Sequence, residues 1–179
     1  MLTLSEFQIA YSGLSLGQHK YSFNIEESFF SCFQEGEIET GEVKCDLLLE
    51  KKSDMLVLDF SINGFIDVVC DRCLGVYPQE ISVNNSLIIK FGDEFEEMSD
   101  EIIVIPESKQ DINVSQYIYE YIHLAIPAKR LHPGGTGSRM NCDKETLKKL
   151  ESLNVSEKDD NNIEEIDPRW EKLKNIKFD

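Results

Sequence analysis

Apolar and polar residues alternate along several stretches of the chain, which is the pattern of half-buried β-strands. The first stretch is His19–Ile25, and the second lies within 37–50. The longest is Met55–Val69, and it is followed by Val76–Phe91 and by the short apolar run Ile102–Ile105. No helix-sized insert separates these stretches, so successive strands are expected to pair antiparallel.

The alternation breaks in the middle of the longest stretch, at Asn63-Gly64. Before this dipeptide every second position is apolar: Leu56, Leu58, Phe60 and Ile62 share one face. After it the apolar residues occupy neighbouring positions: Phe65, Ile66, Val68 and Val69. Asn-Gly is also a common hairpin turn, but its flanks are short here. The pattern therefore favours a bulge within one long strand.

A helix is predicted from Val114 to Ala125, because apolar residues recur along one helical face. Asp111 and Asn113 precede this segment and are candidate caps for its first turn. Pro127 follows it and disfavours helical backbone in the residue before it. His123 lies beside the apolar face, where a packed histidine at the edge of the core is the simplest interpretation.

Three shorter segments complete the predicted fold. The aromatic residues Phe29, Phe30 and Phe33 suggest a helical turn that fills the core, and 143–153 suggests a short helix. Residues 93–101 carry a run of like charges, which is typical of a solvated loop. The sequence thus predicts a mainly β (α+β) fold. It should contain about six strands in a curved antiparallel sheet or barrel-like β domain, with helices in the C-terminal third.

Composition divides the chain into three predicted parts. Residues 1–153 should form a single β-rich domain, and 154–166 is rich in acidic and polar residues, as flexible linkers are. Residues 167–179 should form a short amphipathic helix, because Asp167 suits the N-cap, Pro168 suits the first turn and Trp170 begins an apolar face. So short a helix is marginal alone and needs a surface to pack on, either its own domain or a partner.

The charge balance limits the kinds of partner. The 179 residues include 34 acidic and 18 basic side chains, for a net charge of −16. This charge repels nucleic acid at long range and attracts basic proteins, such as ribosomal proteins. No apolar run reaches the roughly 18 residues of a membrane span, and no signal peptide is visible at the N-terminus. The five cysteines are an odd number, which favours a reducing cytoplasm over a disulfide framework.

Cysteine spacing raises the possibility of a metal site. Cys70 and Cys73 form a Cys-x2-Cys turn between two predicted strands, and His132 and Cys142 lie downstream around a glycine-rich loop. Three thiolates and one imidazole would suit a closed, structural Zn²⁺ site. The spacing alone favours the alternative of small, half-buried cysteines at a strand end, because His132 and Cys142 do not form a tight second pair.

Residues 121–141 contain no acidic side chain. They contain Lys129, Arg130 and Arg139, and Arg72 would join them if the metal ligands met. Such a patch could bind RNA phosphates on an otherwise acidic protein. The alternative is an ordinary polar loop in which the lack of acids is due to chance.

Motifs of the common enzyme classes are missing from the sequence. It contains no glycine-rich phosphate loop after a strand, no His-Glu-x-x-His and no nucleophile elbow. Cys70-Asp71-Arg72-Cys73 is followed by a predicted strand, whereas a reactive thiol usually lies at a helix N-terminus. We therefore expect a protein that is not an enzyme and has no small-molecule substrate.

The chain resembles the bacterial YceD family in motifs spread over nearly its whole length. These are Gly13-Leu14, Phe29-Phe30, Gly64, Cys70-Asp71-Arg72-Cys73-Leu74, Leu124-Ala125-Ile126-Pro127, His132…Cys142 and Asp167-Pro168-Arg169-Trp170. The cysteine motif and the terminal Asp-Pro-Arg-Trp are specific in combination. The resemblance implies a role in accumulation of the large-subunit (23S) ribosomal RNA, and hence in ribosome biogenesis.

Two modes of action follow as hypotheses. The protein could bind large-subunit rRNA, a basic ribosomal protein of that subunit, or both, through the basic loop and the terminal residues Asp167, Pro168, Arg169 and Trp170. Alternatively, it could be a zinc-stabilised acidic scaffold that escorts a basic protein without touching RNA.

Overall fold

A computed structural model describes residues 4–33, 36–132 and 142–153. The chain divides into two compact units, Met1–Asn141 and Cys142–Asp179. The predicted linker 154–166 and the predicted helix 167–179 lie outside the described residues. The division of the chain into a β-rich domain, a linker and a terminal helix therefore stays a prediction.

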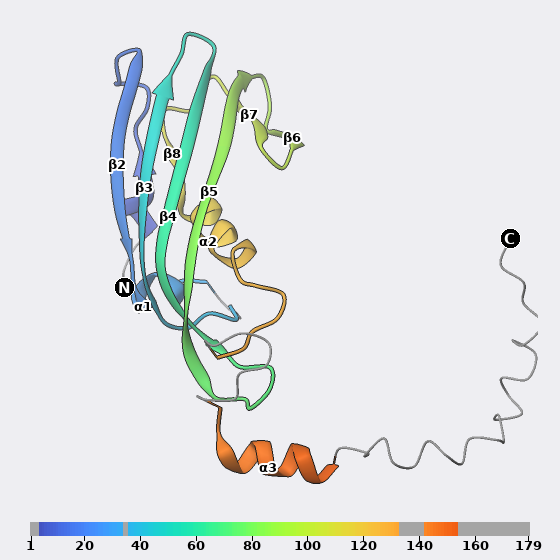
Figure 1. Ribbon diagram of the computed structural model, residues 1–179. Coiled ribbons are helices and arrows are strands. Elements are labelled where there is room, and N and C mark those ends of the chain that lie inside the picture. The colour runs from blue at the N-terminus through green and yellow to red at the C-terminus, as the bar shows by residue number, and fades with distance from the viewer. Residues whose placement is uncertain (1–3, 34–35, 133–141, 154–179) are drawn as a thin grey trace, which may run out of the picture. The chain divides into compact units, whose positions relative to one another are not determined.

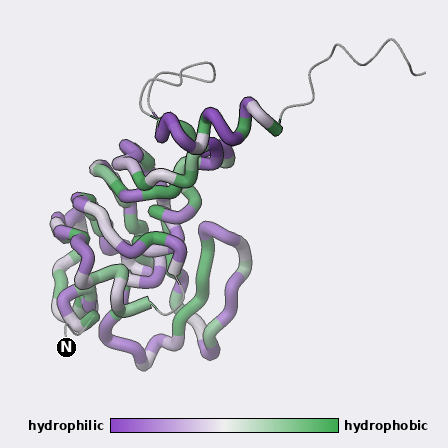
Figure 2. The backbone as a smooth tube through the Cα atoms, turned by 90° about the horizontal axis from the view of Figure 1, so that it is seen from below, coloured by the Kyte–Doolittle hydropathy of each residue, from purple (hydrophilic) through white to green (hydrophobic). Residues whose placement is uncertain are grey.

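Six strands of the first unit form one sheet in the order β2-β3-β4-β5-β7-β6. Their bounds are Gly17–Ile25 (β2), Gly41–Lys51 (β3), Met55–Val69 (β4), Val76–Gly92 (β5), Glu96–Ser99 (β6) and Ile102–Pro106 (β7). The long strands curve together (Figure 1), and hydrophobic and hydrophilic residues alternate along the chain (Figure 2). The predicted mainly β fold with a curved sheet is confirmed. Because β2 and β6 are its two edges, the described strands form an open sheet and not a closed barrel.

The edge near residue 100 differs from the prediction in two ways. β5 and β7 pair in parallel, although all other neighbours in this sheet are antiparallel. The acidic segment expected to be a loop contains β6. This strand forms the edge of the sheet, and β7, which follows it in sequence, lies between β5 and β6. All four β6 residues are exposed. Glu96 and Glu97 there place charge on an edge strand, which discourages pairing with another chain.

The bulge predicted at Asn63-Gly64 is wrong. β4 pairs with β3 and β5 in unbroken register, and Gly64 lies opposite Val43 and Ile81. The inward residues keep the same alternation beyond the glycine, since Ile66 and Val68 are buried while Phe65 is 51% exposed. Gly64 has a φ of +155°, and a Cβ there would lie 2.2 Å from the Glu42 carbonyl oxygen. A residue without a side chain therefore lets two backbones approach closely.

A second layer covers the inner face of the sheet. The short elements η1 (Leu4–Phe7), β1 (Gln8–Ile9), α1 (Glu27–Phe30) and β8 (Ile112–Asn113) contribute to it, together with α2 (Ser115–Leu124). β1 and β8 pair antiparallel. Aromatic rings join the layers: Phe7 packs on Phe23 with centroids 5.1 Å apart, and Phe60 packs on Tyr121 at 5.3 Å.

The helices predicted within 114–125 and 143–153 are both present. The N-cap of α2 is Val114 and not Asn113 or Asp111, but the Asn113 side chain accepts a hydrogen bond from the Ser115 backbone N–H at 2.9 Å. The second unit contains α3 (Lys144–Leu153). Asp143 precedes this helix, and its carboxylate accepts a hydrogen bond from the Thr146 N–H at 2.7 Å. That contact lowers the pKa of Asp143. None of the side chains of α3 is buried.

Lys51, at the end of β3, ties the 10–16 segment to the sheet. Its Nζ donates hydrogen bonds to the carbonyl oxygens of Tyr11 (2.9 Å), Ser12 (3.1 Å) and Leu14 (2.9 Å). We expect Lys51→Met to keep the apolar stem, lose these charged bonds and reduce the free energy of unfolding by about 2 kcal/mol. Urea denaturation would measure this. Lys52→Met is the control, because the Lys52 side chain forms an exposed ion pair with Glu50, and an equal loss there would contradict the role of Lys51.

Candidate metal centre

The cysteine turn joins the ends of the two longest strands. β4 ends at Val69 and β5 begins at Val76, so the turn occupies 70–75. The Leu74 N–H donates to the Cys70 carbonyl and the Cys70 N–H donates to the Gly75 carbonyl, both at 2.9 Å. Leu74 is the only non-glycine residue in the described part of the chain with a positive φ, 60°. This left-handed residue closes the turn and lets Cys70 and Cys73 face the same point.

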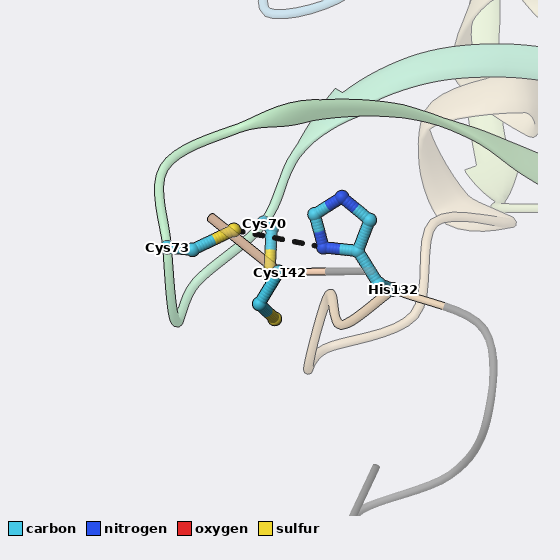
Figure 3. Close-up of side chains that lie close together, drawn as sticks. All are labelled: Cys70, Cys73, His132 and Cys142. Carbon is cyan, nitrogen blue, oxygen red and sulfur yellow. Dashed lines mark hydrogen bonds between the residues drawn. The ribbon is translucent and has the colours of Figure 1, made fainter. Parts of the chain in front are cut away.

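Four potential ligands meet at this turn: Cys70, Cys73, His132 and Cys142 (Figure 3). One ligand atom from each lies within 4.8 Å of all the others, and all three cysteines are buried and free of disulfides. Cys142 is the first residue of the second unit.

The donor set fits zinc in chemistry, and one pair of donors also fits it in spacing. A sulfur and an imidazole nitrogen bound to one tetrahedral zinc would lie about 3.6 Å apart, given the usual bond lengths. The Cys73 Sγ and the His132 Nδ1 lie 3.6 Å apart. The four residues could therefore hold a metal ion, and four protein donors are the number found in closed, structural zinc sites.

The environment of Cys70 favours the thiolate that a metal requires. Burial raises the pKa of this thiol. Hydrogen bonds from the backbone N–H groups of Cys73, Arg72 and His132, and from the His132 side chain, outweigh burial and lower the pKa of Cys70 to about 6. The N–H groups directed at the Cys70 sulfur thus stabilise its thiolate even without a bound metal.

Asp71 and Arg130 hold the segment that carries His132 against the cysteine turn. The Asp71 N–H donates to the Arg130 carbonyl at 2.8 Å, and the Arg130 N–H donates to Asp71 Oδ2 at 2.7 Å. The His132 ring also packs on Tyr77 of β5, with centroids 4.8 Å apart. Backbone pairing therefore positions His132 next to Cys73, although 59 residues separate the two in sequence.

The basic patch is more neutral than the sequence suggested. The Arg130 guanidinium pairs with Glu37 and also lies 3.6 Å from Asp71. Its side chain is only 25% exposed, and the hydrogen bond with Glu37 raises the pKa of Arg130 further. Lys129 is exposed and Arg72 is half-buried. Most of the Arg130 charge is thus committed to two carboxylates within the protein.

Other predicted site residues lie outside the described residues: Arg139, Asp167, Pro168, Arg169 and Trp170. The residues that sequence reasoning missed are Glu37 and Asp71, which bind Arg130, and Tyr77, which supports His132. Asp71 could have been suspected from its place inside the cysteine motif. Glu37 lies 93 residues from Arg130, and no local pattern links the two.

Comparison with known proteins identifies a family for this chain. Residues 58–177 match the family model described as "Large ribosomal RNA subunit accumulation protein YceD". The match includes all four potential ligands and covers about two thirds of the chain. Searches of curated proteins and of solved structures gave no match. No helix within the described ranges is long and apolar enough to cross a membrane.

Proposed function

Because the chain belongs to the YceD family of large ribosomal RNA subunit accumulation proteins, we propose that it is a non-enzymatic factor in large-subunit biogenesis. It would support accumulation of 23S rRNA in the cytoplasm by binding that RNA, a basic ribosomal protein of the same subunit, or both. The family match carries this proposal.

Zinc would act as a structural clamp in this role. Cys70, Cys73, His132 and Cys142 would hold the ion, and the ion would supply no reaction chemistry because a four-ligand site leaves no open position. It would fix the segment ending at His132, and with it the exposed Lys129, at the end of β4 and β5. The 3.6 Å contact between Cys73 and His132 supports this arrangement.

The RNA-binding mode would use Lys129, Arg72 and Arg139, with Arg130 serving mainly to position the loop. The terminal residues Asp167, Pro168, Arg169 and Trp170 would form a second contact on an acidic tether. Tethering would raise the effective concentration of this second contact.

The second candidate is an escort for a basic protein without RNA contact. Two observations favour it: the net charge of −16, and the pairing of Arg130 with Glu37 and Asp71. The two modes differ in their salt dependence, because each phosphate contact adds about one to the slope of log affinity against log salt concentration.

We predict that Lys129→Glu weakens binding to a 23S rRNA fragment and lowers the salt slope by about one. Filter binding over a range of salt concentrations would measure both quantities. The control is Lys109→Glu, which makes the same charge change at an exposed site distant in sequence. In cells that lack the wild-type gene, Lys129→Glu should also reduce the ratio of 23S to 16S rRNA.

Each outcome has a definite meaning. If the two variants behave alike in both assays, the RNA contact at Lys129 is wrong. If 23S rRNA accumulates normally in cells without the protein, the proposed function itself is wrong.

A further inference from the structure

The outer face of the sheet carries apolar side chains at the end next to the cysteine turn. Phe65, Asp67 and Val69 of β4 lie directly opposite Glu80, Pro78 and Val76 of β5, and these six residues, the end face, point away from the core. Phe65 is 51% exposed, Val69 45% and Val76 66%. Three large apolar side chains that share one exposed face are typical of an interaction surface.

Two adjoining hollows border the end face. One, of about 490 Å³, is lined in part by Glu26, Glu27, Glu42 and Phe65, and the other, of about 200 Å³, by Glu37, Glu39, Val69 and Val76. Thr40 and Asp67 line both, and the Thr40 hydroxyl donates to Asp67 at 2.7 Å.

The charge of these hollows is strongly one-sided. Together they contain six carboxylates, whereas the one basic lining residue is Arg130, which already pairs with Glu37. The hollow beside Phe65 is lined by no lysine or arginine at all. The end face thus combines exposed apolar side chains with carboxylates whose charge is not balanced within the hollows.

We propose that the end face binds a basic polypeptide segment of a partner protein, one in which lysine or arginine alternates with apolar residues. Apolar side chains of such a segment would cover Phe65, Val69 and Val76. Its cations would enter the hollows beside Glu26 and Glu42. An extended segment presents side chains to alternate sides, which matches a face where apolar residues and carboxylates lie side by side.

Charge excludes the obvious alternatives as main occupants. RNA would place phosphates against six carboxylates, and a second copy of this chain would bring another net charge of −16. A basic segment is attracted by the same charges, which also speed its association. Where the partner is a ribosomal protein the inference rests on the proposed function, but the recognition chemistry can be tested without it.

The test uses the intact protein and a fluorescent twelve-residue peptide in which lysine alternates with valine and phenylalanine. We expect Glu26→Lys/Glu42→Lys and, separately, Phe65→Ala each to weaken peptide binding at least tenfold, roughly the effect of removing one interface hot spot. The charge control is Glu94→Lys/Glu107→Lys, which makes the same change at exposed positions outside both hollows. The apolar control is Phe95→Ala, at a phenylalanine that is 57% exposed.

Equal losses in the test and control variants would overturn the proposal, because general attraction to an acidic protein would then explain the binding. Stronger competition by polyuridylate than by unlabelled peptide would also overturn it in favour of RNA. So would a tenfold gain in affinity on Trp170→Ala, since the chain's own C-terminal segment would then be the occupant. If the end-face variants lose peptide binding but 23S rRNA levels in cells stay normal, the end face binds a basic segment for a purpose other than the proposed function.

Discussion

Cys70→Ser is expected to abolish zinc binding and the stability that depends on it. Serine removes the thiolate whose pKa is lowered to about 6 by the surrounding N–H groups. The affinity for zinc should fall by more than about a hundredfold. Loss of a residue that only orients a metal ligand already lowers affinity by up to about that factor, and Cys70 is itself a proposed ligand. At free zinc a hundred times the wild-type dissociation constant, the lost stabilisation should be about 2.7 kcal/mol. Elemental analysis and thermal melting, each with and without chelator, would measure both effects.

Two further cysteine variants make this test specific. Cys142→Ser should behave like Cys70→Ser if Cys142 is the fourth ligand. Cys32→Ser is the matched control, because Cys32 lies outside the group and its sulfur donates to the Ser28 carbonyl at 3.3 Å, a bond that serine can replace. Wild-type protein that contains no zinc after purification without chelator would contradict the metal site.

Gly64→Ala should be the most destabilising single methyl addition among the glycines that the structure describes. The new Cβ would lie 2.2 Å from the Glu42 carbonyl oxygen and 2.7 Å from the Val43 Cα, both backbone atoms of a paired strand. It would also strain a backbone held at a φ of +155°. Strain and overpacking together should cost about 3 kcal/mol or more. Urea denaturation would show the loss as a lower midpoint at an unchanged slope.

Two other glycines separate strain from space. Gly17 has a φ of +116°, but an added methyl group would meet no atom within 4 Å, so Gly17→Ala should cost only the strain, about 1–2 kcal/mol. Gly13 also has open space and is not among the residues with positive φ, so Gly13→Ala should be neutral or slightly stabilising. A loss at Gly64 no larger than that at Gly17 would show that close strand approach is unimportant.

Local patterns determined much of this protein. Alternation of apolar and polar residues is set by the two-residue repeat of a strand, so it placed β4 from Met55 to Val69 as the structure has it. The recurrence of apolar residues likewise located α2 to within one residue at either end. The Cys-x2-Cys spacing marked Cys70 and Cys73, because ligand spacing on a turn is also a local property.

Contacts between distant segments decided the rest. Phe65 and Ile66 are both apolar, so composition could not say which one faces the core; pairing of Gly64 with Val43 and Ile81 decided it. The same pairing turned Phe65 and Val69 outward and created the end face. The partner of Arg130 is a carboxylate 93 residues away, which only the folded chain brings near. Side-chain periodicity is encoded residue by residue, whereas strand order, ion pairing and the unmatched charge of a surface depend on which segments become neighbours.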